Sequence, residues 1–459
     1  MLHKNQQLTL DVTEVNNLGF GVARADNGQV VFVSGAVEGE RVEAKLIHVT
    51  KSYAVARTES VLKPSPYRAE DACCVKGCGG CAYRLLTHDY EMSVKHRYVE
   101  KCLHDAGLSH IFVEPVVSGA RLTGYRNKAQ YPVGRDTDGK IMFGFFAPKS
   151  HRVVEASGCL LQPPIFERIL STLGCFFDAY SVSVYDEETH TGLLRHIYLR
   201  RSEKGDVLLC VVVNGEALPC EAEFVRAVRE AHPEIVGILL NIQKEKTNVI
   251  CGDTYRLLWG EASLTDTLAG VTLSLSPESF YQVNHEMATL LYDEARHRAK
   301  LQGNELLLDL YCGVGSIGLS MARDVREVIG IEVVEGAVTC ATENARRNGI
   351  ENASFYVGDA ARAEDLLAHA EKERDAPIRP DVVVLDPPRK GCDRQLLLYL
   401  ARLAPSRIIY ISCNPKTLAE DMAVLIGEGY RADKVTPFDL FPRTAHVESV
   451  VCLTRTFDN

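Results

Sequence analysis

The sequence lacks long hydrophobic runs, a signal-type leader, internal repeats and low-complexity tracts. No apolar run approaches the roughly 18 residues that a membrane-spanning helix needs, so we expect no contact with a membrane. The first residues, MLHKNQQLTLDV, lack the apolar core of a signal peptide, so we expect a cytoplasmic protein. Positive charge is not in excess either. The net charge of −10 argues against nonspecific binding of polyanions by the whole surface, although it leaves room for a local basic groove.

The 459 residues are enough for two or three domains with full hydrophobic cores. Hydrophobic residues make up 46% and charged residues 24% of the chain, which is ordinary for a globular protein and excludes global disorder. There are 15 cysteines. In a long chain without a secretory signal, we interpret them as reduced thiols or metal ligands rather than as a disulfide framework.

Residues 5–60 alternate apolar and polar positions with a period of two. The strand candidates, separated by glycines, are LTLDV, GVARA, VVFVSG, RVEAKLI and YAVARTE. Five short strands in so short a segment predict a small closed or partly open β-barrel. A generic β-domain without a ligand fits the same pattern, so the pattern alone assigns no function.

Residues 63–275 have a mixed texture that predicts a central α+β domain, with a linker at Pro64 and Pro66 and a helix over about residues 87–106. Within residues 121–152, basic and aromatic residues are interleaved. They are Arg121, Arg126, Lys128, Arg135, Lys140, Lys149 and Arg152, with Tyr125, Tyr131, Phe143, Phe145 and Phe146. This combination suits phosphate contacts with base stacking, and a solvated strand face with buried aromatic residues fits it as well.

Residues 276–459 alternate strand and helix patterns. The strand candidates are ELLLDLY, EVIGIEV, ASFYVGD, DVVVLD and RIIYIS. Helical patterns such as EGAVTCATENARRNG lie between them. This alternation predicts a doubly wound, mostly parallel, Rossmann-like α/β sheet, which binds its ligands beyond the carboxyl ends of the strands.

A glycine-rich turn follows the first of these strands. Gly313, Gly315 and Gly318 form G-x-G-x-x-G, which lets a ligand approach the N-terminus of the next helix. Glu332, at the end of the second strand, can accept hydrogen bonds from both hydroxyls of a ribose. Nicotinamide dehydrogenases and S-adenosylmethionine-dependent methyltransferases share this geometry, and a purely structural turn is a third interpretation.

Two further carboxylates favour the methyl donor. Asp309, four residues before the first glycine, suits a cationic amino group and would repel a pyrophosphate. Asp359, after the third strand, lies where an adenine amino group could bind. At the end of the fourth strand, Asp386 is followed by two prolines, which predict a rigid, non-helical edge over the pocket.

Cys413 follows the fifth strand in IIYISCNPKTL, where Asn414 and Pro415 would hold the thiol toward the pocket. Because it shares a rim with the glycine turn and Asp386, we interpret Cys413 as a nucleophile rather than an inert packing residue. Glu448, in LFPRTAHVESVV, opens an apolar strand. A partly shielded carboxylate there could act as a general base, and a surface glutamate is the alternative.

A thiolate, a methyl donor and a base together fit methylation of uracil at C5. Addition of the thiolate to C6 makes C5 nucleophilic, so that C5 can take the methyl group by in-line displacement. The C5 proton must then leave so that β-elimination releases the enzyme. Within a folded nucleic acid, the target base must also leave its stack.

The motifs DLYCGVG, DPPRKG, ISCNP and FPRTAHVES, in this order, resemble those of the RNA (uracil-5-)-methyltransferases, in particular of members that carry a TRAM domain and act on 23S rRNA. The resemblance implies an S-adenosylmethionine-dependent enzyme with Cys413 as nucleophile and Glu448 as base. It also implies six residues that bind the methyl donor: Gln282 (in SFYQVN), Tyr311, Ser316, Glu332, Asp359 and Asp386.

The same resemblance implies a multidomain α/β protein with three parts. We expect an RNA-binding, OB-like TRAM barrel over residues 1–62, a central iron–sulfur and RNA-binding domain over 63–275, and a class I methyltransferase domain over 276–459. In this family the helix near 87–106 packs on the methyltransferase domain, so the boundary need not be sequential. The expected partner is RNA; we expect no protein partner and a monomer.

Four cysteines lie close together in DACCVKGCGGCAYR, and Cys159 lies further along the chain. Their spacing fits zinc or an iron–sulfur cluster, and chance clustering of reduced thiols is the alternative. The resemblance implies a [4Fe-4S] cluster on Cys78, Cys81 and Cys159, with Cys73 as the fourth ligand and Cys74 as its substitute. The family usually has its upstream cysteine one position earlier, where this chain has Ala72. We expect the cluster to be structural, because methyl transfer involves no net electron transfer.

Three hypotheses follow. The first is an enzyme that makes 5-methyluridine in 23S rRNA, with tRNA as the alternative substrate, because some relatives with a barrel modify tRNA. The second is a nicotinamide oxidoreductase, which would leave Cys413, the two prolines and the barrel unexplained. The third is a non-catalytic RNA-binding factor with a vestigial pocket, which the presence of every expected catalytic residue disfavours.

Overall fold

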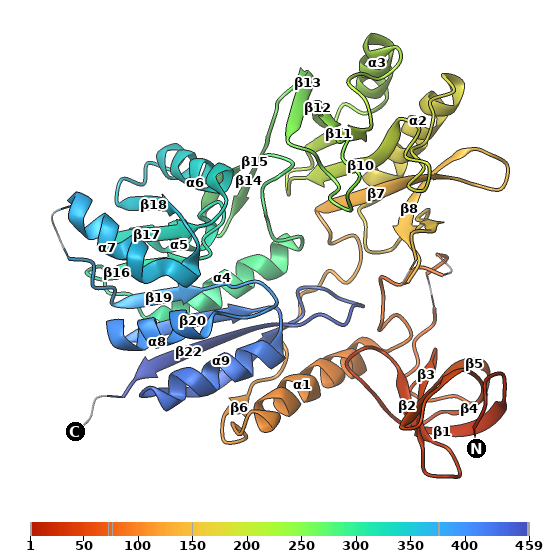
Figure 1. Ribbon diagram of the computed structural model, residues 1–459, viewed down its shortest axis with the longest axis horizontal. Coiled ribbons are helices and arrows are strands. Elements are labelled where there is room, and N and C mark those ends of the chain that lie inside the picture. Colours follow the sequence, from red (N-terminus) through yellow and green to blue (C-terminus); the bar gives the residue numbers. More distant parts are fainter. Residues whose placement is uncertain (1, 72, 76, 149, 375–376, 457–459) are drawn as a thin grey trace.

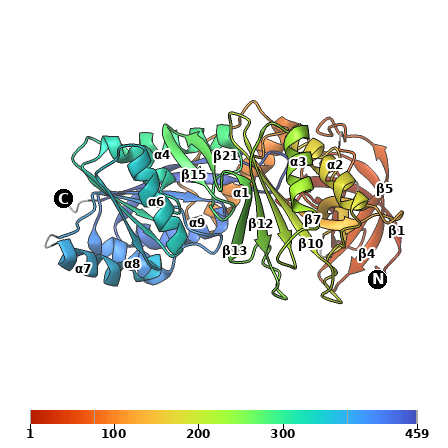
Figure 2. The same ribbon diagram turned by 90° about the horizontal axis from the view of Figure 1, so that it is seen from above.

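The computed structural model describes residues 2–71, 73–75, 77–148, 150–374 and 377–456. Within these residues the chain forms a closed barrel, a seven-stranded sheet, a two-stranded hairpin and an eight-stranded sheet (Figure 1). Seen from above, the eight-stranded sheet lies at one end of the molecule and the barrel at the other (Figure 2). The seven-stranded sheet lies on the same side of the eight-stranded sheet as the barrel, above the barrel in the view of Figure 1. No helix in the described ranges is long and apolar enough to cross a membrane.

The N-terminal segment forms the barrel that its alternating pattern predicts. Its strands are β1 (Gln7–Val15), β2 (Gly21–Arg24), β3 (Val30–Ser34), β4 (Arg41–Val49) and β5 (Tyr53–Lys63), closed in the order β1-β2-β3-β5-β4. Inward-pointing side chains such as Leu10, Val33 and Leu46 are almost fully buried and fill the barrel. The prediction of a small closed barrel is confirmed.

The central sheet has the order β13-β12-β11-β10-β7-β8-β9. Its strands are β7 (Lys128–Arg135), β8 (Ile141–Phe146), β9 (Val153–Glu155), β10 (Leu194–Arg201), β11 (Val207–Val213), β12 (Ile235–Ile242) and β13 (Thr254–Gly260). Two helices, α2 (Pro164–Ala179) and α3 (Glu221–Ala231), pack on one face of the sheet through an apolar stripe.

The aromatic residues interleaved with basic residues in 121–152 do not form one stacking surface. Tyr125, Tyr131 and Phe143 are almost completely buried, and the latter two belong to the core of the central domain. Phe146 is more exposed and lies against His151. For the three buried rings the structural interpretation holds. Strand alternation turns Tyr131 of β7 and Phe143 of β8 inward, while Tyr125 lies before β7. Lys149, also in this window, lies outside the described residues.

The C-terminal sheet has the order β18-β17-β16-β19-β20-β22-β21-β6. The predicted strands are β16 (Leu306–Leu310), β17 (Glu327–Glu332), β18 (Ala353–Val357), β19 (Val382–Leu385) and β20 (Arg407–Ser412), all parallel. Beyond them, β22 (Glu448–Arg455) runs antiparallel to both β20 and β21 (Tyr430–Phe438). The predicted doubly wound sheet is confirmed.

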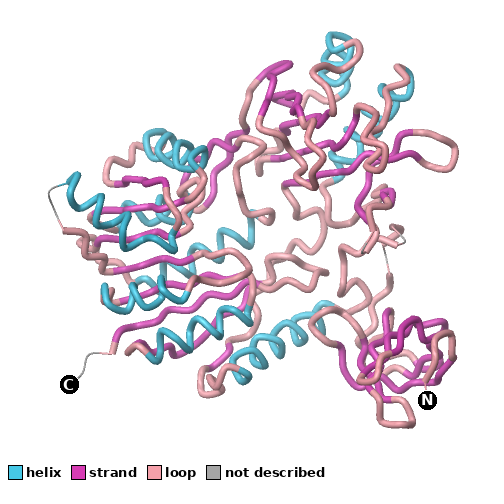
Figure 3. Tube along the Cα trace, in the orientation of Figure 1, coloured by secondary structure: helices cyan, strands magenta, loops and turns pink. Residues whose placement is uncertain are grey.

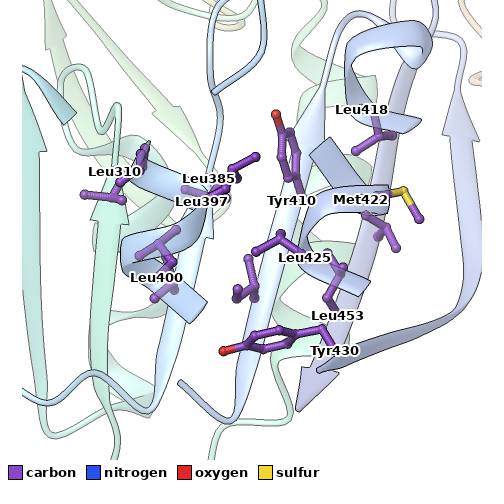
Figure 4. Packing of buried hydrophobic residues seen from close by; sticks show 14 of the residues in the cluster. Leu310, Leu385, Leu397, Leu400, Tyr410, Leu418, Met422, Leu425, Tyr430 and Leu453 are labelled. Atoms are coloured by element: carbon purple, nitrogen blue, oxygen red, sulfur yellow. The ribbon is translucent and has the colours of Figure 1, made fainter. Parts of the chain in front are cut away.

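Helices cover both faces of this sheet. One face carries α7 (Ala363–Arg374), α8 (Arg394–Leu403) and α9 (Pro415–Gly427). Leu397, Leu400, Leu418, Met422 and Leu425 from α8 and α9 interlock there with the sheet (Figure 4). The other face carries α4 (His285–Ala299), α5 (Ser316–Met321) and α6 (Glu335–Arg347).

Two segments from earlier in the chain join this C-terminal core. Helix α1 (His88–Asp105) buries Val99, Cys102 and Leu103 against α9 and β21, and β6 (Phe112–Val113) extends the sheet beside β21. The hairpin of β14 (Leu264–Leu268) and β15 (Val271–Leu275) packs against the opposite face. The C-terminal core therefore includes α1 and begins before residue 276, so it is not one continuous stretch of sequence.

Candidate active site

The carboxyl ends of the parallel strands form one edge of the C-terminal sheet, which faces the central sheet and the barrel (Figures 1 and 3). Asp386 follows β19, and Cys413 follows β20. Because β22 is antiparallel to β20 and Ser412 pairs with Ser449, Glu448 begins β22 at this same edge. In the order β19-β20-β22, the three side chains therefore lie on adjacent strands.

The turn after β20 holds Cys413 rigidly at this edge. Asn414 caps helix α9, accepting a hydrogen bond from the Lys416 N–H at 3.2 Å, and Pro415 occupies the first helical turn. The Asn414 side-chain amide also donates to the Arg389 carbonyl at 2.8 Å. The Pro387-Pro388 segment that leads to Arg389 is thereby tied to the turn that carries the thiol.

The glycine turn joins the ends of β16 and β17. The Gly313 N–H donates to Glu332 Oε2 at 3.1 Å, and the Val334 N–H donates to Glu332 Oε1 at 2.9 Å. Gly318 has no room for a side chain, because a Cβ would lie 2.8 Å from Asp309 Oδ2. The three glycines thus bring the start of α5 against the strand, as a nucleoside-binding turn requires.

Asp309 lies completely buried beneath this turn. Its Oδ2 accepts a hydrogen bond from the Gly318 N–H at 2.8 Å, while its Oδ1 has no partner among the described residues. A buried acceptor without a donor is costly, so this oxygen suits a cationic group or an ordered water. Ser316 lies nearby, with its Oγ 2.9 Å from the Tyr292 hydroxyl.

The site concentrates buried carboxyl groups whose pKa values are raised. Burial, with Asp386 and Glu332 nearby, raises the pKa of Asp309 to about 7. Burial raises the pKa of Asp386 to about 7, and burial together with Asp386 raises that of Glu448 to about 8. Because burial disfavours the ionised form of these carboxyl groups, a cationic ligand would bind them favourably. The sulfonium and ammonium groups of S-adenosylmethionine are such cations.

Cys413 shares this electrostatic environment. Burial and the charges of Glu448 and Asp386 raise the pKa of its thiol to about 11, while Arg389 acts in the opposite direction. The thiol is therefore protonated at neutral pH before ligands bind. A cation that neutralises the carboxylates would favour the thiolate, so binding of a positively charged donor and activation of Cys413 are linked through charge.

Arg389 and His446 form a polar rim beside the thiol. Arg389 Nη2 lies 2.9 Å from His446 Nδ1. Burial and the charge of Arg389 lower the pKa of His446 to about 4, so the imidazole is neutral. Arg389 is exposed and supplies a positive charge that faces both Cys413 and Glu448.

The segment SFYQVN crosses from the central domain into this site. Gln282 is buried. The Asn127 side-chain amide donates to the backbone carbonyl of Gln282 at 2.8 Å, and the Asn127 backbone N–H donates to the Val283 carbonyl at 2.8 Å. Asn284 caps α4 and donates from Nδ2 to the Leu440 carbonyl at 3.1 Å. These bonds fix Gln282 between the central sheet and the loop that leads to Glu448.

The last two expected donor-binding residues lie along the same edge. Tyr311 follows β16 with a φ of 66°, a strained left-handed conformation, and burial and the Cys392 sulfur raise its pKa. Asp359 is exposed and caps the short helix η2 (Ala360–Arg362), with its Oδ1 accepting a hydrogen bond from the Ala361 N–H at 2.9 Å. The structure thus brings the other expected catalytic and donor-binding residues to the carboxyl-end edge of the sheet, while Gln282 lies beside the loop that leads to Glu448.

Sequence reasoning did not assign a role to Asn284, Tyr292 or Arg389. Asn284 and Arg389 lie inside motifs that the sequence already distinguishes, SFYQVN and DPPRKG. Tyr292 carries no such signal. It is buried on α4, and its pKa is raised by burial and by the charges of Asp386, Asp309 and Glu448, which places it among the three carboxyl groups.

The expected cluster cysteines also come together. Burial and the charges of Cys159, Cys73 and Cys78 raise the pKa of Cys81 to about 12. The Gly80 N–H donates to the Cys78 sulfur at 3.4 Å. Cys74 instead points its thiol to the Ser157 carbonyl at 3.3 Å. Within the described ranges, no three His, Cys, Asp or Glu side chains are arranged to hold a single metal ion.

Comparisons with known proteins agree with this geometry. Residues 270–456 match the family model of the tRNA (Uracil-5-)-methyltransferases, and residues 3–58 match the TRAM domain. An uncharacterized RNA methyltransferase of Halalkalibacterium halodurans is 36% identical over 455 residues, covering 98% of both chains. One from Clostridium tetani is 36% identical, covering 98% of this chain and 97% of that protein.

A solved structure has the same architecture. The tRNA (uracil-54, C5)-methyltransferase of Pyrococcus abyssi in complex with S-adenosyl-L-homocysteine superposes with a TM-score of 0.79 at 25% sequence identity. The match covers 97% of this chain and 100% of the other.

Proposed function

The chain belongs to the family of S-adenosylmethionine-dependent RNA (uracil-5-)-methyltransferases, and from that premise we propose that it methylates C5 of a uridine in 23S ribosomal RNA. The observation that carries the proposal is the pairing of Ser412 with Ser449, which brings Cys413 and Glu448 to adjacent strand ends beside Asp386. A thiol, a carboxyl group and a cation-binding pocket are the groups that this reaction needs.

In the proposed reaction, the Cys413 thiol loses its proton to solvent and adds as a thiolate to C6 of the target uracil, and the resulting enolate makes C5 nucleophilic. When bound, S-adenosylmethionine supplies an electrophilic methyl group, which C5 takes. Glu448 then removes the C5 proton, the electrons of that bond restore the C5–C6 double bond, and Cys413 leaves as a thiolate. Arg389, beside both groups, stabilises the negative charge that develops during addition.

The donor pocket is proposed to consist of Gln282, Tyr311, Ser316, Glu332, Asp359 and Asp386. The carboxylate of Glu332, already held by two backbone N–H groups, has lone pairs left for the ribose hydroxyls. The unpaired Oδ1 of Asp309 suits the ammonium group of the donor's amino acid end. The raised pKa values of Asp386 and Glu448 support a positively charged occupant.

The direct test is the position of 5-methyluridine in RNA. RNA from a strain without this gene should lack one or more 5-methyluridines in 23S rRNA, and a plasmid copy of the wild-type gene should restore them. Purified protein should transfer label from S-adenosylmethionine to an unmodified 23S transcript and should not oxidise reduced nicotinamide. Unchanged rRNA in the deletion strain, with wild-type protein that binds RNA without methylating it, would favour the non-catalytic hypothesis.

A second substrate is supported by a specific observation. The Pyrococcus abyssi enzyme, which matches this chain over nearly its full length, acts on tRNA. The barrel and the cysteines favour rRNA, because family members that lack both usually act on tRNA. Mapping both RNA classes from the same deletion strain separates the two, since only the true substrate loses its methyl group.

We also propose that Cys73, Cys78, Cys81 and Cys159 bind a structural [4Fe-4S] cluster. The Leu161 and Gln162 backbone amides act to lower the pKa of the Cys159 thiol, which favours the thiolate that an iron–sulfur cluster needs. Cys74, whose thiol is engaged elsewhere, is not included. Anaerobically purified protein should contain four iron and four sulfide per chain, Cys81→Ser should lose both, and Cys74→Ser should retain them.

A cytoplasmic, monomeric enzyme without a protein partner completes the proposal. Light scattering should give the mass of one chain for the protein alone, and the mass of one chain plus the bound RNA when RNA is added.

A further inference from the structure

The loop between β21 and β22, Asp439–Val447, carries His446 and leads directly into Glu448. Three elements hold it in place. Asn284 donates to the Leu440 carbonyl at 3.1 Å, and the Tyr125 hydroxyl donates to the Pro442 carbonyl at 3.1 Å. The third element is helix α1, which lies more than 300 positions earlier in the chain and contacts the loop through charged side chains.

Lys95 of α1 is almost completely buried and reaches the loop at two points. Its Nζ lies 2.5 Å from Asp439 Oδ1 and 3.3 Å from the Phe441 carbonyl. It also bonds Glu91 Oε1 at 2.9 Å, one helical turn away. Glu91 Oε1 in turn accepts the Arg443 N–H at 2.7 Å, so Lys95 and Glu91 together hold both halves of the loop.

Arg443 completes this network, which we call the α1–loop network (Glu91, Lys95, Asp439 and Arg443). Arg443 adopts a φ of 70°, a strained conformation that needs support from its surroundings. Its Nη1 donates to the Leu86 carbonyl at 2.8 Å, and its own carbonyl accepts the Tyr83 N–H at 3.0 Å. The segment just after Cys81 therefore also contacts the loop.

Buried charges are a poor means of holding two elements together if stability alone is required. Desolvation of Lys95, Glu91 and Asp439 offsets much of their mutual attraction, and apolar residues of similar volume would stabilise as well or better. The directional hydrogen bonds between α1 and the loop instead fix one conformation of the loop. This loop leads directly into Glu448.

We propose that Lys95, with Glu91 and Arg443, is a positioning residue of the methyltransferase reaction: the α1–loop network sets the β21–β22 loop so that the Glu448 carboxylate meets the C5 proton. The inference rests on the proposed function. In this proposal the three side chains act indirectly, by fixing the position of the loop rather than by contact with the reacting atoms.

In the proposed reaction, the position of Glu448 matters to the elimination step, in which the C5 proton is removed. Addition of Cys413 to C6 and transfer of the methyl group to C5 need the thiol and the donor, not a base on C5. After these steps C5 carries both a methyl group and a proton, and the C6–S bond persists until a base takes that proton. A displaced Glu448 should therefore slow elimination and let the methylated covalent adduct between protein and RNA accumulate.

The test is Lys95→Met, which keeps the volume of the side chain and removes its bonds to Asp439, Phe441 and Glu91. Full-length protein is mixed with labelled donor and the unmodified transcript that the wild type methylates, and adduct is measured on a denaturing gel. We expect turnover to fall at least tenfold, the KM for RNA to stay within about twofold, and the adduct fraction to rise severalfold above wild type.

A matched control is Arg407→Met. Arg407 is a half-buried cation at the opposite end of β20, where it donates to the Lys300 carbonyl at 2.8 Å. This variant should lose stability but keep wild-type turnover per folded molecule and adduct fraction. If Lys95→Met does not fold, Arg443→Met, which removes only the side-chain bonds of Arg443, takes its place with the same expectation.

A folded Lys95→Met or Arg443→Met protein that loses turnover without accumulating adduct, or that behaves as wild type, overturns the inference. Glu448→Gln is the reference for the adduct. If Glu448→Gln also yields no adduct, the proposed chemistry fails instead, so the two failures are distinguishable.

Discussion

Ser412 and Ser449 face each other across β20 and β22, the last pair of this ladder before the strands separate. The residue after Ser412 is Cys413 and the residue before Ser449 is Glu448. Antiparallel pairing therefore places a thiol and a carboxyl group, 35 positions apart in sequence, on the same rim. The expectations below depend on that pairing and on the charges around it.

Cys413→Ala should reduce methylation by on the order of 10³-fold or more, because C5 of uracil is a poor nucleophile without addition at C6. Transfer of labelled methyl groups to RNA measures the loss. Cys452→Ala, which alters a half-buried cysteine of β22 away from the pocket, should keep wild-type activity. A Cys413→Ala protein that still restored 5-methyluridine in a deletion strain would rule out covalent catalysis by this residue.

Glu448→Gln should stop the reaction after methyl transfer. The amide cannot take the C5 proton, so RNA should stay attached to Cys413 and migrate with the protein on a denaturing gel. The double variant with Cys413→Ala should show no such band. Absence of a shifted band in the single variant, with donor and RNA both bound, would contradict the role of Glu448 as base.

Donor binding should release protons and strengthen as the pH rises from 6 to 8. Asp309 and Asp386, with pKa values of about 7, and Glu448, with a pKa of about 8, are partly protonated in the empty pocket, and a cation favours their ionised forms. Calorimetry in buffers of different ionisation enthalpy measures both effects. The affinity for S-adenosylhomocysteine, which has an uncharged sulfur, should depend less on pH. Asp386→Asn should lower the affinity for the donor about tenfold, or ~1.4 kcal/mol.

The free energy of unfolding should fall as the pH rises from about 5 to 8. The pKa of Glu448 is about 8 in the folded protein and 4.5 as its ordinary value, so within this range the folded state retains a proton that the unfolded chain has released. Glu448→Gln cannot ionise. It should therefore be more stable than wild type at pH 8, by on the order of 2 kcal/mol, with the difference vanishing near pH 5.

Urea unfolding at the two pH values measures this difference. Glu428→Gln, an exposed substitution at the end of α9, should show no pH-dependent gain. A Glu448→Gln protein that is equally destabilised at both pH values would contradict this expectation. It would indicate that the Glu448 carboxyl group makes a stabilising hydrogen bond, rather than that burial disfavours its ionised form.

Much of the site was predictable because its signals are local. The apolar runs before Asp309, Glu332, Asp386 and Cys413 predict parallel strands, and parallel strands present their carboxyl ends on one edge. The glycines between β16 and α5 are likewise a local signal. Glu332 ends such a strand, Asp359, Asp386 and Cys413 each follow one, and Glu448 begins one, so their positions in the sequence already indicate one edge. Gln282, Tyr311 and Ser316 were expected only from the family resemblance.

What the sequence did not predict depends on contacts between distant segments. Lys95 and Asp439 are 344 positions apart, and no periodicity within α1 indicates which sheet the helix will cover. The hairpin of β14 and β15 has alternating residues that fit the central domain as well as the C-terminal one. The burial of Tyr131 and Phe143 could not be predicted for the same reason. Alternation along a strand separates two sets of side chains, but which set is buried depends on the face of the sheet that other segments cover.

The charge of the pocket also has a consequence for exchange of the spent donor. Asp309, Asp386 and Glu448 hold their protons more tightly as long as nothing positive lies among them. If the donor sulfur binds near these acids, as we propose, it is neutral once the methyl group has left, and part of its electrostatic attraction to the pocket is lost. We therefore expect the spent donor to bind less tightly than fresh donor, which would favour its release after each turnover.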